Sequence, residues 1–211
     1  MVYHKLTVCA SYHLPDGPDV PLRSFGGGLI CNRDGEWIIG ISMCLHNDIY
    51  FDSDCTIPFY IVLLEGLELA WLRGFRYLEV NLGFVFHHSF WSGFTKDVVT
   101  KKFRLCVTSF SAINPRLLVI LKTVEDYLNR EWFIEVKNTE LFGEEAGVLT
   151  VALMADCQDQ AKKIYDFRTH PLNTGFMSTD MMNMVSEIAS YVIDKSAYNA
   201  SVQEKKYFGL N

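Results

Sequence analysis

The sequence predicts an α/β domain in which a mixed sheet carries helices on its faces. Three observations predict it: strand-like alternation within the first 42 residues, an Asp-Gly turn between two such runs, and helical spacing of apolar residues from Pro58 onward. The chain has 211 residues, 49% hydrophobic and 21% charged, which suits one domain with a full-sized core. Disordered, collagen-like and coiled-coil proteins are excluded.

The first elements are predicted to be strands. Apolar and polar residues alternate over residues 5–10, and a Pro/Asp/Gly-rich loop follows at 15–19. The next two runs, 25–31 and 36–42, flank Asp34-Gly35, a dipeptide that supplies the positive φ angles of a tight hairpin. Three successive antiparallel strands are therefore expected.

Helices and strands then alternate. Apolar residues recur every three or four positions from Pro58, and Gly74 is a natural helix C-cap. Residues 75–81 alternate like a fourth strand, a helix is expected over 115–129, and residues 132–137 read as the fifth strand. The order predicts crossovers between strands that lie in one sheet.

The remaining chain is predicted to be largely helical from Glu144 onward, with a turn-rich stretch at 165–175. An amphipathic helix begins at Ser178, and its apolar stripe contains Met181, Val185, Ile188 and Val192. This stripe either packs back on the domain or docks on a protein partner. We expect one domain over 1–157 and a C-terminal extension over 158–211.

Composition narrows the class of protein. The six cysteines include no C-x-x-C pair, so neither a zinc site nor a disulfide framework is indicated. The amino terminus does not resemble a signal peptide, and no uncharged apolar run approaches the ~20 residues that span a bilayer. An intracellular protein, cytoplasmic or nuclear and without membrane contact, is expected. The net charge of -6 argues against a chain that coats nucleic acid by charge alone.

Three ordered segments carry a resemblance to a known family: Gly27–Gly40, Leu63–Gly74 and Phe75–Val80. Together they resemble the ribonuclease H-like domains of plant genomes, which are similar to the ribonuclease H part of retrotransposon reverse transcriptases. The resemblance covers roughly Tyr3 to Cys157. It implies the ribonuclease H-like fold, a five-stranded mixed sheet flanked by helices, in which three antiparallel strands come first.

The resemblance also implies a chemistry, cleavage of RNA in RNA–DNA hybrids by two Mg²⁺ ions held by four carboxylates. The four family positions correspond here to residues without a carboxylate, namely Cys9, Phe59, Gly83 and Gly147. A thiol is a soft ligand unsuited to Mg²⁺, and Phe and Gly offer no side-chain oxygen. The sequence therefore predicts a degenerate catalytic site, with no catalytic residues, no metal and no cofactor.

Five other acidic residues are candidates to replace the missing metal-binding carboxylates. Asp16 and Asp19 lie in a loop, Glu79 is expected to point away from the site, and Glu144 and Glu145 lie near the fourth position. A two-metal site built from these residues would depend on loops instead of rigid strand centres. A Mg²⁺-dependent hybrid endonuclease with such a rearranged site is the alternative interpretation.

One basic cluster stands out, interleaved with Phe94 and Phe103: Lys96, Lys101, Lys102 and Arg104. The resemblance implies that a basic segment in this part of the chain grips the hybrid, whereas the plainer interpretation is a solvated surface.

Three other patterns have structural explanations. His87-His88 sits in an aromatic stretch expected to form a partly buried helix or loop, because adjacent histidines point in different directions. Gly26-Gly-Gly28 is expected to be a tight strand entry where backbone passes close to backbone. Cys9, in mid-sheet, is expected to be an inert small hydrophobe instead of a nucleophile.

The sequence therefore predicts a pseudo-nuclease, a catalytically inactive ribonuclease H-like module that binds nucleic acid or another protein. A retroelement-derived chain that has decayed without a selected role is a third interpretation.

Overall fold

The first three strands follow one another as antiparallel neighbours. The computed structural model describes residues 3–13, 23–46, 56–106, 115–139 and 162–166. Within them the paired strands are β1 (His4–His13), β2 (Arg23–Asn32) and β3 (Trp37–His46). The predicted turn joins β2 to β3: Gly35 has a φ of +87°, and Asn32 Oδ1 accepts hydrogen bonds from the N–H groups of Asp34 and Glu36, each at 2.9 Å. The hairpin prediction is confirmed.

The first crossover returns the chain to the other side of β1. Helix α1 (Thr56–Leu72) is followed by Gly74, whose φ of +77° closes the helix in the left-handed region. β4 (Tyr77–Leu82) then lies parallel to β1. The predicted helix and fourth strand are confirmed to within two residues at each boundary.

The second crossover adds a strand outside β4. Helix α3 (Pro115–Leu128) buries one stripe of apolar residues, which contains Leu117, Leu121, Val124 and Leu128. β7 (Phe133–Asn138) follows and pairs in parallel with β4. Both elements were predicted from their periodicity.

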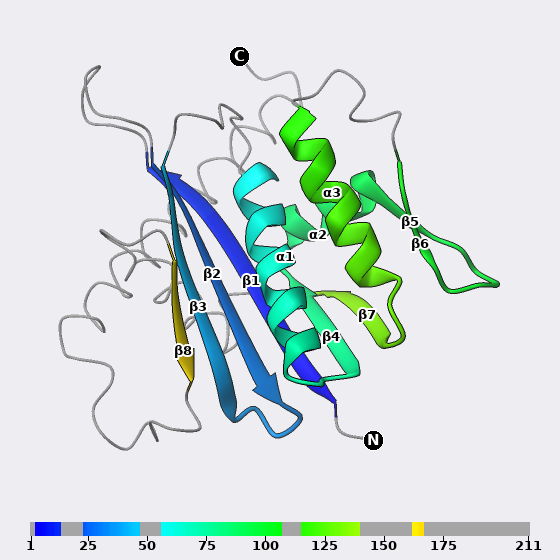
Figure 1. Ribbon diagram of the computed structural model, residues 1–211, viewed down its shortest axis with the longest axis horizontal. Coiled ribbons are helices and arrows are strands. Elements are labelled where there is room, and N and C mark those ends of the chain that lie inside the picture. Colours follow the sequence, from blue (N-terminus) through cyan, green and yellow to red (C-terminus); the bar gives the residue numbers. More distant parts are fainter. Residues whose placement is uncertain (1–2, 14–22, 47–55, 107–114, 140–161, 167–211) are drawn as a thin grey trace, which may run out of the picture.

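Three short elements between β4 and α3 were not assigned as such from the sequence. The aromatic stretch predicted as a helix or loop is helix α2 (Phe84–Gly93). It runs directly into a two-stranded ribbon, β5 (Phe94–Lys96) and β6 (Phe103–Leu105). Strands of three residues are too short to show a period of two, so local patterns cannot identify them. Figure 1 shows this ribbon reaching away from the sheet and its helices.

The α/β fold class is confirmed, because the sheet contains the five predicted strands in the predicted mixed arrangement, with three antiparallel strands first. The described strands lie in the order β7-β4-β1-β2-β3-β8 (Figure 1). The sixth, β8 (Lys162–Asp166), was not predicted, because this part of the chain was expected to be helical or turn-rich. It pairs antiparallel with β3, and Arg73, the residue after α1, binds Asp166 at 2.8 Å. A pairing partner some 120 residues away in the chain is not encoded in local periodicity.

The main core lies between the sheet and the helices α1 and α3, which Figure 1 shows side by side over one face. Two glycines allow the close approach of α1. A Cβ on Gly66 would meet the Leu6 side chain at 2.7 Å, and one on Gly26 would overlap Val62 of α1. The Gly26–Gly28 stretch is therefore crowded by side chains, instead of by backbone as predicted.

Several predicted features lie outside the described residues, among them the helix from Ser178 and most of the predicted extension over 158–211. Of that extension, the structure describes β8, which joins the sheet of the first domain. Among the helices that the structure describes, none is long and apolar enough to cross a membrane.

Candidate functional site

The residue at the family's first-strand position lies in the middle of the sheet. Cys9 of β1 stands opposite Gly27 of β2 and is 4% exposed. Burial raises the pKa of the Cys9 thiol to about 12, and a backbone hydrogen bond with Gly27 only partly opposes this effect. A thiol that stays protonated is a poor nucleophile and a poor metal ligand. These are the properties of a small hydrophobic core residue.

Gly83 directly follows the adjacent strand, β4, close to the position of Cys9 on β1. In the parallel pairing of β1 with β4, Val8 stands opposite Leu82, so the next residues along the two strands are Cys9 and Gly83. Gly83 is buried and caps the amino end of α2, where its carbonyl accepts a hydrogen bond from the N–H of His87 at 2.8 Å. Its φ of -62° is open to any L residue, so the backbone does not require glycine here.

Phe59, predicted to replace the helix carboxylate, lies in the core between α1 and α2. The side chain is fully buried and stacks on Phe86 of α2, with 4.8 Å between ring centroids and 9° between ring planes. Tyr60 packs beside Phe59 at 4.9 Å, and the Tyr60 hydroxyl donates a hydrogen bond to the carbonyl of Ser89. Phe86 lies one turn into the helix that follows Gly83, so Phe59 and Gly83 both lie near the start of α2. Cys9 alternates with Leu6, Val8 and Ala10, which pack in the core with Phe59, so its side chain points to the other face of the sheet.

The donor set at these three positions does not fit a magnesium ion. A protonated thiol, a phenyl ring and a glycine supply no hard side-chain oxygen. Among the described residues, no three His, Cys, Asp or Glu side chains come together in a group that could hold a metal ion. Gly147 and four of the acids weighed as replacements, Asp16, Asp19, Glu144 and Glu145, lie outside the described residues.

The fifth candidate acid, Glu79, forms an ion pair with Lys137 of β7. It lies four residues before Gly83 on β4, and its carboxylate accepts a hydrogen bond from Lys137 Nζ of β7 at 2.5 Å. At the rise of a strand, four residues correspond to about 13 Å. Glu79 is therefore placed for contact with β7 and not with Gly83.

The adjacent histidines lie on α2 and have different environments. Trp91 Nε1 donates a hydrogen bond to His87 Nε2 at 3.0 Å, whereas His88 is exposed. The helix is partly buried and aromatic, as the sequence predicted, and the two imidazoles do not face the same space.

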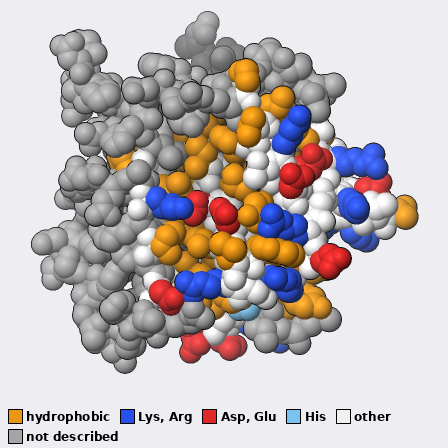
Figure 2. Space-filling view, in the orientation of Figure 1, with side chains coloured by type: hydrophobic (Ala, Val, Ile, Leu, Met, Phe, Trp, Pro, Cys, Tyr) orange, Lys and Arg blue, Asp and Glu red, His pale blue; other side chains and the backbone are white. Residues whose placement is uncertain are grey.

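The predicted basic cluster lies on the ribbon of β5, β6 and their connecting turn, which we call the basic hairpin (residues 94–105). Three of its four cations are exposed: Lys101, Lys102 and Arg104. Figure 2 shows Lys and Arg side chains gathering at the end of the molecule where Figure 1 places this hairpin. The structure thus brings three predicted residues together on one projecting surface.

Lys96, the fourth cation, has a different environment. Its ammonium donates a hydrogen bond to the carbonyl of Ile134 in β7 at 3.0 Å and lies over the Phe103 ring at 4.8 Å. Its pKa is lowered, chiefly by burial. Lys96 therefore attaches the basic hairpin to the sheet instead of extending into solvent with the other three.

The turn of the basic hairpin is fixed by Asp97. Its carboxylate accepts hydrogen bonds from the N–H groups of Thr100 at 2.6 Å and Val99 at 2.9 Å, and these hydrogen bonds, with that of Thr100 first, lower the Asp97 pKa. The backbone of Lys101 takes up the left-handed conformation, with φ at +59°. Val98 and Val99 at the tip are 80% and 88% exposed. The Asp-x-x-Thr turn between two Phe-containing triplets was the sequence signal for this hairpin.

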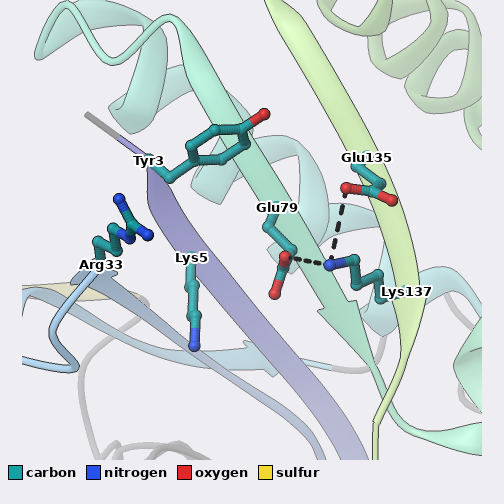
Figure 3. Close-up of a pocket in the computed structure, with 6 residues that line it drawn as sticks. All are labelled: Tyr3, Lys5, Arg33, Glu79, Glu135 and Lys137. Atoms are coloured by element: carbon teal, nitrogen blue, oxygen red, sulfur yellow. Dashed lines mark hydrogen bonds and ion pairs between the residues drawn. The ribbon is translucent and has the colours of Figure 1, made fainter. Parts of the chain in front are cut away.

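A pocket of about 600 Å³ on the sheet was not predicted from the sequence (Figure 3). It is lined by Tyr3, Lys5, Arg33, Glu79, Glu135 and Lys137. Charged residues at alternate positions of β1, β4 and β7 could have indicated the pocket. The sequence of one strand does not show how the three strands are aligned, however, and this alignment brings the charged residues together.

Comparison with known proteins gives distant structural neighbours. No protein-family model matches the chain, and no curated protein matches its sequence. A crystal structure of RNase H1 from the halophilic archaeon Halobacterium salinarum NRC-1 aligns with 73% of this chain and 98% of its own, at 15% identity and a TM-score of 0.42. The protease-reverse transcriptase of prototype foamy virus aligns over 72% of this chain and 20% of its own, at 12% identity and a TM-score of 0.45.

Proposed function

We propose that this chain is a catalytically inactive ribonuclease H-like module that binds nucleic acid through the basic hairpin. The observation that carries the proposal is the placement of charge. The family's catalytic positions at Cys9, Phe59 and Gly83 are buried and uncharged, whereas Lys101, Lys102 and Arg104 are exposed on a projecting ribbon.

The loss of catalysis follows from ligand chemistry. Phosphodiester hydrolysis by two metals needs hard oxygen ligands that hold the ions and lower the pKa of a bound water. Cys9 retains its proton at neutral pH, and the Phe59 ring is buried in the core and stacks on Phe86. No step of a metal-dependent reaction can therefore be assigned to these residues.

Binding follows from the geometry of the basic hairpin. A hairpin held by Asp97 and attached through Lys96 presents its cations without a large loss of chain entropy when it binds. The hairpin has four cations and one carboxylate, so it is locally basic although the whole chain is acidic. Lys101 keeps a cation in a backbone conformation that favours glycine, which supports a role for that charge.

The first experiment tests for catalysis. The protein is incubated with a labelled RNA–DNA hybrid and Mg²⁺ or Mn²⁺, and no cleavage above the protein-free control is expected. Cleavage that disappears with EDTA would establish the alternative, a metal-dependent hybrid endonuclease. The double variant Glu144→Ala, Glu145→Ala then shows whether those acids form its rearranged site.

The second experiment tests binding. Fluorescence anisotropy measures the affinity for a labelled hybrid between about 50 and 200 mM salt. In a plot of the logarithm of the binding constant against the logarithm of the salt concentration, each phosphate contact contributes a slope of about -0.9. We call this quantity the salt slope. Replacing Lys101, Lys102 and Arg104 with Gln is expected to reduce the magnitude of the slope by about 2 to 3.

The matched control compares two single changes: Lys102→Gln removes one exposed cation from the basic hairpin, and Lys122→Gln removes one exposed cation elsewhere, on α3. The Lys122→Gln variant is expected to keep the wild-type salt slope. An equal reduction in both variants would mean diffuse attraction without a hairpin site. The absence of hybrid binding at the lowest salt would refute the proposed function and leave a protein partner as the interpretation to examine.

A further inference from the structure

The pocket in Figure 3 lies on the side of the sheet opposite α1 and α3. Leu6, Val80 and Ile134 point into the core beneath those helices, so the residues alternating with them point the other way. Strand register aligns these outward residues in two rows. Lys5, Glu79 and Glu135 are opposite one another in one row, and the other row begins with Tyr77 opposite Phe133.

The second row is aromatic. Tyr3 lies 5.7 Å from Tyr77 and 6.4 Å from Phe133 between ring centroids, so three rings on adjacent strands support one another. Phe133 is 47% exposed, and Tyr3, which lines the pocket, is half-buried. Such a fixed aromatic surface beside a pocket can stack a planar ring at low entropic cost.

The charges of the pocket are unequally paired. Lys137 binds both carboxylates, Glu79 at 2.5 Å and Glu135 at 3.6 Å, which raises its pKa. Lys5 and Arg33 take part in none of the ion pairs between residues that the structure describes. Lys5 and Arg33 thus keep two unpaired positive charges, whereas Lys137 offsets one of the two negative charges on the side of β4 and β7 (Figure 3). The six lining residues together carry a net charge of +1.

We infer that this pocket binds a nucleotide, with its phosphate between Arg33 and Lys5 and its base against the ring of Tyr3. Arg33 supplies a planar fork of donors suited to a phosphate, and Lys5 supplies a second positive charge. Glu79 and Glu135 can accept hydrogen bonds from the amino group of a base. One ligand class, an aromatic base joined to a phosphate, satisfies all three features of the pocket. The pocket shares no lining residue with the basic hairpin, although Lys96 of that hairpin lies 6.0 Å from the centre of the Phe133 ring.

Isothermal titration calorimetry with adenosine monophosphate, adenosine and inorganic phosphate tests this inference. The monophosphate should bind at least about tenfold more tightly than either fragment, because it alone engages both the aromatic row and the cations. Equal binding of inorganic phosphate would leave a simple anion site, and equal binding of adenosine would remove the role of the cations. Either result, or no heat at millimolar monophosphate, overturns the inference.

Variants locate the site. Arg33→Gln and Tyr3→Leu are each expected to weaken binding of the monophosphate about tenfold, whereas only Tyr3→Leu should weaken binding of adenosine. Arg33 is exposed, so its substitution does not threaten the fold. Lys122→Gln on α3 is the charge-matched control and should bind like wild type. Unchanged binding in Arg33→Gln would place the ligand elsewhere.

Two variants distinguish failure of the proposed hybrid binding by the basic hairpin from failure of the proposed nucleotide binding by the pocket. The variant with Gln at 101, 102 and 104 should bind the monophosphate normally, and Arg33→Gln should keep the salt slope of hybrid binding. Loss of hybrid binding alone would therefore count against the basic hairpin, and loss of monophosphate binding alone against the pocket.

Discussion

The centre of the sheet and the basic hairpin differ in charge and in exposure to solvent. At the centre, Cys9, Phe59 and Gly83 are all buried and uncharged, and Phe59 and Gly83 lie near the start of α2. In the basic hairpin, Lys101 and its neighbouring cations are exposed, and hydrogen bonds to Asp97 fix the turn that carries them. The first region is therefore a packed interior, and the second is the exposed surface through which we propose that the chain binds nucleic acid.

The difference shows what each region contributes to stability. Several carboxylates around one point repel each other when no metal neutralises them, so their replacement by packed apolar groups stabilises a scaffold. The left-handed backbone of Lys101 works in the opposite direction, because a non-glycine residue there is strained. Substitutions in the two regions should consequently change different measured properties.

The largest expected effect is on folding, from Phe59→Ala. The ring is fully buried and stacked on Phe86, so its removal leaves a cavity between α1 and α2. The free energy of unfolding should fall by about 3 to 5 kcal/mol, measured by urea denaturation. Phe59→Leu, which keeps most of the volume, should cost less than half as much.

The basic hairpin supplies the contrast for this prediction. Replacing Lys101, Lys102 and Arg104 with Gln should change the free energy of unfolding by less than about 1 kcal/mol, because these side chains are exposed. If Phe59→Ala proved as mild as this variant, the centre of the sheet would not be a packed core, and a polar or metal-holding site would have to be reconsidered.

The sequence predicted the elements whose pattern extends over six or more residues. The five predicted strands and the helices α1 and α3 were all found in runs of this length, and Gly35 and Gly74 mark two of the turns. Helix α3 shows a clear apolar stripe, whereas α1 is apolar on nearly all of its sides. β8 was missed because it is held by its pairing with β3 and by the contact between Arg73 and Asp166. Such long-range pairing leaves no trace in a local window.

The candidate site was predictable in composition but not in arrangement. The resemblance identified the altered positions, yet the partner that buries Phe59 is on α2, whose packing no local pattern reveals. The basic cluster was found as a run of cations, although Lys96 bonds to Ile134, 38 residues further along the chain. The pocket beside Tyr3 depends on register between strands, which one strand cannot show.

A smaller effect concerns pH and the centre of the sheet. The pKa of Cys9 is about 12 in the folded protein, above its ordinary 9.0, so the protonated thiol stabilises the fold fully below pH 9. That contribution is lost as the pH rises from 9 towards 12, by about 1.4 kcal/mol per unit. Between pH 8 and pH 10, wild type should therefore lose about 1 kcal/mol more than Cys9→Ala in urea denaturation. The other buried cysteines are common to both proteins and cancel; identical pH slopes would mean that the Cys9 thiol is not desolvated.

The smallest expected effect separates stability from binding within the basic hairpin, through Lys101→Gly. Glycine adopts a φ of +59° without strain, and this relief, of about 1 to 2 kcal/mol, exceeds the added freedom of the unfolded chain, so stability should rise by about 0.5 kcal/mol. The same change removes a phosphate-binding cation, so hybrid affinity should fall and the magnitude of the salt slope should drop by about 1. Lys102→Gly, at a neighbouring exposed position without a positive φ, removes the same charge and should gain no stability. A more stable Lys101→Gly variant with unchanged hybrid binding would show that Lys101 does not contact nucleic acid. The contrast between an apolar scaffold and a nucleic-acid-binding hairpin would then lose its strongest support.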